Sequence, residues 1–346
     1  MSDELPQPSM LALPNELRDA IAQALAAVPA QRWIHAAQEV SARYRGPRSA
    51  KHQALASGNE QALGYAALVL PATYAQLVGA FAATAARLPG WQPSTLLDLG
   101  SGPGTALWAA STQWPNIGAM YAYEREPALL SLGRTLASAS AHPTVQAAHW
   151  QRGDLAQFAP TERYDLVVLG HVLNELDPSL RQQVVARAWA ATAGVLLIVE
   201  PGTAVAFEVV RAAREALLVE GAYTIAPCAH NLPCPLANDW CHFPQRLHRP
   251  EFQRRARGAP SQWEDSKFAY AAMARFASPA PIWGRVIREP AYNKAYAEAV
   301  VSTTHGAIEA VRALKRHREA FRQVKGLEWG QALIAPPEVE ASAEAD

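Results

Sequence analysis

Leu96-Leu97-Asp98-Leu99-Gly100-Ser101-Gly102-Pro103-Gly104-Thr105 is the stretch of this chain that decides its fold. An apolar run ends in three glycines at alternate positions and continues into a helical pattern over residues 105–112. A turn with almost no side chains lets the backbone approach a ligand closely, and the following helix directs its first amide groups toward that ligand. The stretch therefore predicts a buried strand, a ligand-binding turn and a helix.

The segments around this stretch alternate between apolar runs and amphipathic patterns. We expect strands at residues 95–99, 118–123, 145–150, 164–169 and 195–199, and helices at residues 105–112, 127–138, 178–191 and 204–220. Apolar strands separated by amphipathic helices indicate a parallel sheet that is covered by helices on both faces. The predicted fold class is therefore α/β, with a doubly wound, Rossmann-like sheet.

Shifts in composition divide the chain into five predicted parts. These are a helical N-terminal domain (1–90), the ligand-binding sheet domain (91–221), an insertion that contains the cysteines (222–280), C-terminal strands with a basic helix that complete the fold (281–335), and a disordered acidic tail (336–346). The uncharged segment 61–86 is long enough to span a membrane. Because Pro71 and Gln76 interrupt it, we expect a pair of buried helices there instead.

Length and composition limit the class of protein. The chain has 346 residues, half of them hydrophobic, and its formal net charge is zero. These values allow a sizeable core and give no overall sign of a nucleic-acid-binding protein. The cysteine count is three, an odd number, and the polar, acidic first residues do not look like a signal peptide. We expect a cytoplasmic protein with reduced thiols and no membrane partner.

Two acidic residues follow later strands of the predicted sheet. Glu124 ends the second strand, twenty residues after Gly104, and Asp154 comes after the third strand. The two oxygens of a carboxylate match the two hydroxyls of a ribose, which suits Glu124, and an acceptor at Asp154 suits the exocyclic amine of an adenine. The spacing therefore predicts a nucleoside-containing ligand. The alternative is that both residues are solvated loop acids.

The form of the glycine turn distinguishes two cofactor classes. A dinucleotide oxidoreductase uses Gly-x-Gly-x-x-Gly, whereas the third glycine here comes two residues after the second. The pattern resembles instead the first motif of S-adenosylmethionine-dependent methyltransferases. That resemblance implies that the turn borders the methionine part of S-adenosylmethionine, with Asp98 close by. The predicted cofactor-binding residues are Asp98, Gly100, Ser101, Gly102, Gly104, Glu124 and Asp154.

The candidates for catalysis lie on the turn after the fourth strand, in Gly170-His171-Val172-Leu173-Asn174-Glu175-Leu176. Methyl transfer from a sulfonium mainly needs in-line alignment, and a nitrogen or oxygen acceptor can also need a base for its proton. His171 is the candidate base, and Asn174 or Glu175 are candidates to bind the cofactor or the substrate. The alternative is that Asn174 caps or packs against the next helix and His171 only lines the pocket.

The three cysteines, Cys228, Cys234 and Cys241, fall within one proline-rich segment without helical or strand periodicity. Clustered thiolates in such a loop indicate zinc or an iron–sulfur cluster. The spacing matches neither a zinc-ribbon pair nor a ferredoxin run. A fourth ligand is needed, and the candidates are His230, Asp239, His242 and His305. The alternative is three packed or capping thiols without a metal.

The same region carries a more specific resemblance. The segments 199–203, 211–214, 226–230 and 240–246 look like the methyltransferase-like proteins of the small ribosomal subunit, which occur in bacteria and as assembly factors in mitochondria. Segments 43–45, 65–74, 266–270 and 328–330 fit too, so that the resemblance covers roughly residues 40 to 330.

The resemblance implies a methyltransferase-type fold, association with small-subunit ribosomal RNA, and in some members a four-cysteine iron–sulfur site. Cys228, Cys234 and Cys241 match three of the ligands. The fourth cysteine of the family falls near Ser302, where this chain has none. The chain therefore uses another fourth ligand, leaves one iron open, or has lost the cluster.

Two C-terminal stretches are basic although the net charge of the whole chain is zero. Residues 245–257 hold five arginines and one acid, and residues 311–325 hold six lysines or arginines and one acid. Ribosomal RNA is the expected partner, and DNA is not. The alternative is a solvated helix face. The predicted RNA-binding residues are Arg246, Arg249, Arg254, Arg255, Arg257, Lys315, Arg316 and Arg318.

Three functions are consistent with the sequence. The first is an S-adenosylmethionine-dependent methyltransferase that acts on, or assembles with, small-subunit ribosomal RNA. The second is a non-catalytic assembly factor that keeps the fold. The third is a small-molecule methyltransferase whose cysteine loop is a structural zinc clip.

Overall fold

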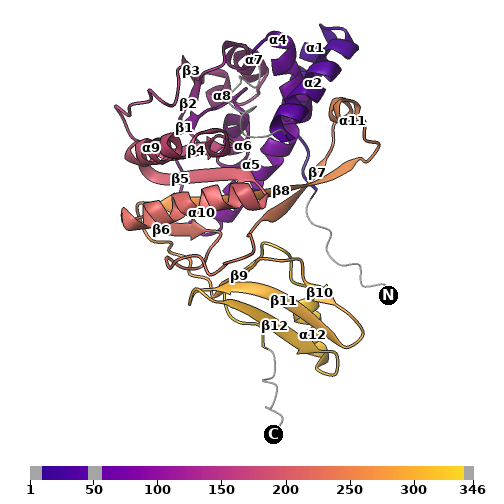
Figure 1. The fold of residues 1–346 in the computed structure, drawn as a ribbon, viewed down its shortest axis with the longest axis vertical. Coiled ribbons are helices and arrows are strands. Elements are labelled where there is room, and N and C mark those ends of the chain that lie inside the picture. The colour runs from indigo at the N-terminus through magenta and orange to yellow at the C-terminus, as the bar shows by residue number, and fades with distance from the viewer. Residues whose placement is uncertain (1–9, 46–56, 339–346) are drawn as a thin grey trace.

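The computed structural model describes residues 10–45 and 57–338, and these form an α/β protein with two sheets. The larger sheet has the strand order β3-β2-β1-β4-β5-β8-β6, with β7 paired to β8. The smaller one has the order β10-β11-β9-β13, with β12 paired to β11. Figure 1 shows the smaller sheet below the larger one, at the C-terminal end of the chain.

The parallel half of the larger sheet confirms the expected doubly wound arrangement. Its strands are β1 (Thr95–Leu99), β2 (Ala119–Glu124), β3 (His149–Arg152), β4 (Tyr164–Gly170) and β5 (Thr192–Pro201), and neighbouring strands run parallel. The third strand was expected at 145–150, which is wrong at its start. Pro143–Gln146 forms the short helix α8, in which Val145 is buried, and the strand begins only at His149.

The larger sheet continues beyond residue 221, where an insertion was expected to begin. It gains β6 (Tyr223–Ala226), β7 (Phe243–His248) and β8 (Trp263–Ala274), and β8 pairs antiparallel with both β5 and β6. The inner residues of β8, from Phe268 to Ala274, are buried against β5. Residues 222–280 therefore complete the larger sheet, and the cysteine loop is the connection between β6 and β7.

Helices cover both faces of the larger sheet. One core cluster contains the N-terminal helices α1 (Asn15–Ala26), α4 (Asn59–Leu68) and α5 (Leu70–Ala85), together with α6 (Thr105–Gln113). The helices α2 (Ala30–Arg45), α7 (Pro127–Ser138) and α11 (Glu251–Arg257) pack on the same side. The opposite face carries α9 (Pro178–Ala190) and α10 (Ala204–Val219).

The uncharged segment forms a bent helix pair inside this core, as expected. No single helix in the described part of the chain is long and apolar enough to cross a membrane. By length and composition alone, α4 and α5 together reach that limit, but they meet at an angle of 51°. Most of their side chains are buried in the protein, including Tyr74, Leu77 and Phe81.

The C-terminal strands form the smaller sheet with its own core. The strands are β9 (Gly284–Val286), β10 (Ala291–Tyr292), β11 (Tyr296–Thr303), β12 (Ile308–Leu314) and β13 (Ala332–Leu333). β11 and β12 form a hairpin that turns at Gly306. The predicted basic helix is α12 (Arg318–Lys325). Residues 339–346, most of the predicted acidic tail, lie outside the described residues.

Candidate functional site

The glycine turn joins β1 to α6 with a backbone that other residues rarely adopt. Gly100 and Gly104 have φ angles of +77° and +80°, in the left-handed region that favours glycine. A Cβ atom at Gly100 would lie 2.3 Å from Val172 Cγ2, and one at Gly104 would lie 2.6 Å from Trp150 Cη2. Both glycines are therefore required by conformation and by the close approach of neighbouring side chains.

A cleft of about 180 Å³ opens beside this turn, at the carboxyl ends of β1, β2 and β4. This is the point where the strand order reverses, because β1 lies between β2 and β4. Open α/β sheets bind their ligands at such a point. Of the predicted site residues, the structure brings six into the wall of this cleft: Gly100, Gly102, Glu124, Asp154, His171 and Glu175.

Glu124 closes the floor of the cleft and is 7% exposed. Its Oε2 accepts a hydrogen bond from the amide of Gly102 at 2.8 Å, and its Oε1 accepts one from the amide of Glu126 at 2.7 Å. A carboxylate has about four acceptor positions. Glu124 can therefore hold the glycine turn and still accept the two hydroxyls of a ribose.

Asp98 lies beneath the turn and is 3% exposed. Burial raises the pKa of Asp98 to about 8, and the neighbouring Glu124 carboxyl adds to the rise. Burial also raises the pKa of Glu124, although the amides that it accepts act against the rise. Two neighbouring buried carboxyls are costly when both are ionised, so a cationic ligand would be favoured here.

Asp154 lies at the outer rim of the cleft. Its Oδ1 accepts the amide of Ala156 at 2.8 Å, and its side chain is 42% exposed. The carboxylate faces solvent and the cleft, so it keeps free acceptor positions for an exocyclic amine.

His171 comes directly after β4 and is held by a residue of α5. Its φ angle is +60°, a conformation that non-glycine residues rarely adopt and that costs energy unless the surroundings impose it. Its Nε2 lies 2.5 Å from Oε1 of Gln76. Gln76 in turn donates to the carbonyl of Lys267 at 3.1 Å and to Oγ of Ser266 at 2.8 Å.

These contacts determine the tautomer of His171. Because the carbonyl of Lys267 can only accept, Nε2 of Gln76 must face it and Oε1 must face His171. Oε1 can only accept as well, so Nε2 of His171 carries the proton. Burial lowers the pKa of His171 to about 4, which keeps the ring neutral at pH 7. Nδ1 has no hydrogen-bond partner in the described residues and is an acceptor at the cleft wall.

Asn174 does not line the cleft, although it was a candidate ligand. It lies on the short 3-10 turn η1 (Leu173–Glu175), and Oε1 of the fully buried Glu200 accepts the amides of Leu173 at 2.7 Å and of Asn174 at 3.3 Å. The side chain of Asn174 also hydrogen-bonds to Glu200. Asn174 is therefore bonded to β5, away from the cleft, and Glu175 is the neighbour that lines the cleft.

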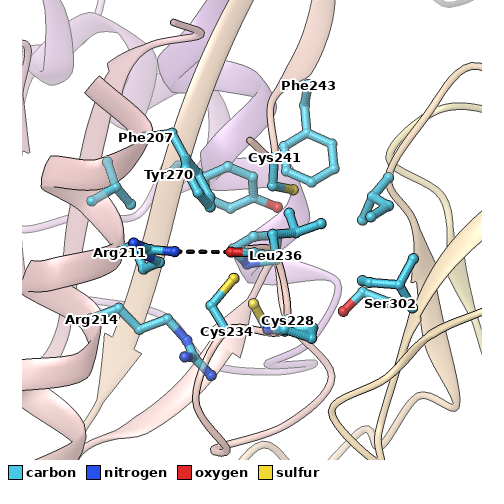
Figure 2. Close-up of a pocket in the computed structure, with 15 residues that line it drawn as sticks. Phe207, Arg211, Arg214, Cys228, Cys234, Leu236, Cys241, Phe243, Tyr270 and Ser302 are labelled. Carbon is cyan, nitrogen blue, oxygen red and sulfur yellow. Dashed lines mark hydrogen bonds between the residues drawn. The ribbon is translucent and has the colours of Figure 1, made fainter. Parts of the chain in front are cut away.

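The three cysteines line a second cavity, between α10 and the smaller sheet. The void measures about 40 Å³, and Ser302, Tyr270, Arg211 and Arg214 also line it. In Figure 2 the sulfurs of Cys228 and Cys234 face each other, and that of Cys241 lies beside the hydroxyl of Tyr270. In the described part of the chain, no three His, Cys, Asp or Glu side chains converge on a position for a single metal ion. The predicted fourth-ligand candidates His230, Asp239, His242 and His305 do not line the void.

Buried arginines beside this second cavity bond to neutral oxygens instead of carboxylates. Arg214 is 3% exposed and donates to Oγ1 of Thr224 and to the carbonyls of His230 and Leu232. Arg285 is also 3% exposed and donates to two backbone carbonyls, while its Nη2 has no partner among the described residues. A buried cation without an anion is costly. An anionic occupant of the cavity would offset that cost.

Of the two basic stretches, the first is partly paired within the protein, because three of its five arginines share two carboxylates. Arg246 pairs with Asp265, and Arg249 and Arg257 both pair with Glu264. Arg255 lies over the ring of Trp33, and Nε of Arg254 is buried. These five arginines therefore present less free charge to RNA than the sequence indicates.

The second basic stretch is paired only in part, since Arg312 pairs with Glu298 and Arg322 pairs with Glu319. Lys315, Arg316 and Arg318 are exposed at the turn between β12 and α12, and none of them forms an ion pair with an acid of the described residues.

Sequence reasoning missed Gln76, Glu200 and Arg285. Gln76 is a polar residue inside an apolar, uncharged helix, and Glu200 is a charged residue near the end of the otherwise apolar strand β5. A polar residue at the end of, or inside, an apolar element was the available signal for both. Arg285 gave no such signal, because its cavity is built by segments far apart in sequence.

Comparison with known proteins identifies the family. The model of the family described as mitochondrial small ribosomal subunit Rsm22 matches residues 59–334. The human ribosome assembly protein METTL17, a mitochondrial protein, is 30% identical over 291 residues, which cover 78% of this chain and 62% of that protein. The chain thus spans about three fifths of the length of this curated relative.

Solved methyltransferase structures resemble the chain more distantly. Magnesium protoporphyrin IX methyltransferase from Synechocystis, with bound S-adenosylmethionine, is 11% identical, with coverage of 75% of this chain and 97% of its own and a TM-score of 0.41. The N-methyltransferase NodS from Bradyrhizobium japonicum, in complex with S-adenosylhomocysteine, is 15% identical, with coverage of 60% and 85% and a TM-score of 0.38.

Proposed function

The chain belongs to the Rsm22 family, and we propose that it binds S-adenosylmethionine and works in the assembly of the small ribosomal subunit, on or beside its RNA. The observation that carries the cofactor proposal is the cleft at the point where the strand order of the sheet reverses. Part of the glycine turn, the buried Glu124 and the exposed Asp154 line it, and the buried Asp98 lies beneath the turn.

The chemistry of S-adenosylmethionine suits each part of this cleft. Its sulfonium and ammonium groups are cations, and Asp98 is a buried carboxyl that a cation would stabilise in its ionised form. Its ribose has two hydroxyls for Glu124, and its adenine has an amine for Asp154. The glycine turn leaves room for the methionine part because Gly102 has no side chain to fill the cleft.

For methyl transfer the cleft offers His171 as a candidate base. The ring is neutral, and its acceptor nitrogen Nδ1 is available at the wall of the cleft. It can accept the proton of a nitrogen or oxygen nucleophile, and alignment of the reacting atoms supplies the rest of the acceleration. Glu175 is the second polar group nearby. The competing function, a non-catalytic assembly factor, is favoured by the structural role of Asn174.

For the second cavity we propose an iron–sulfur cluster in preference to a zinc clip. The sulfurs border a void and do not converge on a point within the described residues, and buried arginines supply the positive charge that an anionic cluster would balance. A cluster is larger than this void, and the loop over residues 228–242, which has no helix or strand, is the segment that would adjust. Cys228, Cys234 and Cys241 would hold the cluster.

The decisive experiment uses the full chain with methyl-labelled S-adenosylmethionine and small-subunit RNA, both naked and in assembly particles. The proposal predicts saturable cofactor binding and co-sedimentation with small-subunit particles. Transfer of label to RNA would establish the enzyme, whereas binding without transfer at every salt concentration would establish the non-catalytic factor. Absence of any small-subunit association would favour a small-molecule methyltransferase. We also propose a cytoplasmic location, and cell fractionation should find the protein in the cytoplasmic fraction.

A further inference from the structure

Trp240 is an exposed aromatic residue close to the point where the cysteine loop joins β7. It is 36% exposed, although a tryptophan is buried in most of its surface as a rule. Its Nε1 donates to the carbonyl of Gly202 at 3.2 Å, and its ring stacks on His242, with centroids 5.6 Å apart and 18° between the ring planes. The indole is therefore held in place with its only donor satisfied, and what remains for a ligand is the surface of the ring.

The stack continues into the protein and ends beside a lysine. His242 is 7% exposed and meets Trp329 edge to face, with ring centroids 4.9 Å apart. Nζ of the exposed Lys267 lies 5.7 Å from the centre of the Trp329 ring. Lys267 has no ion-pair partner among the described residues, and Asp265, the acid on the same face of β8, pairs with Arg246 instead. Four residues thus form one aromatic platform: Trp240, His242, Trp329 and Lys267.

Hydrogen bonds connect the aromatic platform to the cleft. The carbonyl of Lys267 accepts the amide of Gly202 at 3.0 Å and Nε2 of Gln76 at 3.1 Å, and Gln76 also holds His171. His171 follows β4 and Gly202 follows β5, and neighbouring strands of a sheet lie about 5 Å apart. The aromatic platform therefore lies at the same edge of the larger sheet as the cleft.

The strand order places the aromatic platform on the side of the cleft that the cofactor leaves open. The ribose and the adenine of S-adenosylmethionine are assigned above to Glu124 and Asp154, which follow β2 and β3. On the other side of the glycine turn come β4, β5 and β8 in that order. His171, the candidate base, thus lies between the cofactor site and the aromatic platform. A methyl acceptor would approach from the side of the platform.

We propose that the aromatic platform binds single-stranded RNA, with a nucleobase stacked on the exposed ring of Trp240 and a phosphate beside Lys267. The inference rests on the association with small-subunit RNA proposed above, and it adds the form of the RNA and the residues that bind it. Every base has a π-face that an indole can stack on, and only an unpaired base exposes that face fully. The cation beside the rings favours a polyanion over an apolar peptide as the ligand.

The test measures the affinity of the full chain, as purified, for a labelled oligouridylate of about 10 nucleotides, either single-stranded or annealed to its complement. The variants are Trp240→Ala, which removes the ring, Trp240→Phe, which keeps an aromatic face, and Lys267→Ala. Trp263→Ala is the matched control. Trp263 is 41% exposed and its ring contacts that of His248 at 5.1 Å, but it lies about 13 Å from Lys267 along β8. Circular dichroism checks that each variant is folded.

We expect the wild type to bind the single strand in preference to the duplex. Trp240→Ala should weaken this binding about 5-fold or more and Trp240→Phe should weaken it less. Neither should change the slope of log affinity against log salt, because a stacking contact releases no counterions, whereas Lys267→Ala should reduce that slope by about 0.7. Trp263→Ala should bind like the wild type. The RNA should also quench the tryptophan emission of the wild type more than that of Trp240→Phe.

The outcomes separate this inference from the proposal beneath it. A wild type that binds neither the oligonucleotide nor small-subunit RNA would overturn both. RNA binding that Trp240→Ala and Trp240→Phe leave unchanged, equal affinity for the duplex, or an equal loss in Trp263→Ala would overturn the aromatic platform alone. Unchanged RNA affinity in Trp240→Ala together with lost co-sedimentation with small-subunit particles would assign the ring to a protein partner, and would also overturn it.

Discussion

Nε2 of His171 lies 2.5 Å from Oε1 of Gln76, and this hydrogen bond joins the carboxyl end of β4 to the helix α5. It fixes the imidazole in the tautomer that presents Nδ1 to the cleft. It also opposes the strain of a histidine at a φ angle of +60°. The buried Gln76 thus holds His171, the candidate base, in the tautomer that can accept a proton from the cleft.

Replacement of Gln76 by Leu should destabilise the protein and allow both tautomers of His171. The variant leaves the buried N–H of His171 without an acceptor, so we expect the free energy of unfolding to fall by about 1–3 kcal/mol. Nitrogen NMR of labelled histidine should show a mixture of tautomers at His171 in place of one. Urea unfolding measures the first effect, with Gln157→Leu on an exposed loop as the control. Unchanged stability together with an unchanged tautomer would contradict the assignment.

The pH dependence of stability should carry a contribution from His171. Its pKa is about 4 in the folded protein, whereas a histidine in the unfolded chain titrates near 6.5. The unfolded chain therefore binds the proton first, and stability is lost as the pH falls from about 6.5 toward 4. We expect His171→Asn, which tolerates the positive φ, to lose less stability than wild type over that range. Parallel slopes for the two proteins would count against a buried neutral His171.

Binding of S-adenosylmethionine should release protons near neutral pH. Asp98, whose pKa is about 8 in the empty cleft, is mostly protonated at pH 7, and a bound cation favours its ionised form. Affinity should therefore weaken as the pH falls below 8. Calorimetry in two buffers that differ in ionisation enthalpy measures the released protons. Asp98→Asn should bind more weakly and release fewer protons, and equal release from both proteins would rule out Asp98 as the source.

Exposed and paired basic residues should differ in their effect on RNA binding. Replacing Lys315, Arg316 and Arg318 by Ala should weaken binding to small-subunit RNA. It should also reduce the slope of log affinity against log salt by about 0.7–0.9 for each phosphate that the protein no longer neutralises. The matched triple variant Arg246→Ala, Arg249→Ala and Arg257→Ala should change that slope less, because each of these arginines already pairs with Asp265 or Glu264. A larger effect from the second triple variant would reverse the assignment.

The sequence predicted the parallel sheet, the glycine turn and the cleft because each depends on local pattern. Thr95–Leu99 and Pro127–Ser138 have the expected bounds, and Glu124 and Asp154 lie at the expected strand ends. β8 was not predicted, since its buried half consists largely of alanines and its partner strands are distant in sequence. The pairing of Arg249 and Arg257 with Glu264 was invisible for the same reason: tertiary contacts decide which charges stay free.

The cysteine cavity shows a further limit of sequence reasoning. The clustering of Cys228, Cys234 and Cys241 was evident, but the environment of the thiols was not. Arg214 comes from α10 and lines the cavity, Arg285 comes from β9 and acts electrostatically on Cys241, and only the fold brings both near the thiols. The family resemblance placed the fourth cysteine of the family near Ser302, and the structure places Ser302 in the wall of the cavity that the three thiols line.

The most direct test of the central claim is calorimetric titration of the full chain with S-adenosylmethionine, comparing wild type, Gly104→Ala and Gly221→Ala. Both glycines have φ angles near +80°, but only a Cβ at Gly104 would clash, 2.6 Å from Trp150, while nothing lies within 4 Å at Gly221. We predict one site per chain, affinity at least about 10-fold weaker in Gly104→Ala, and wild-type affinity in Gly221→Ala. No binding to the folded wild type, or equal affinity in all three proteins, would contradict the assignment of the cleft.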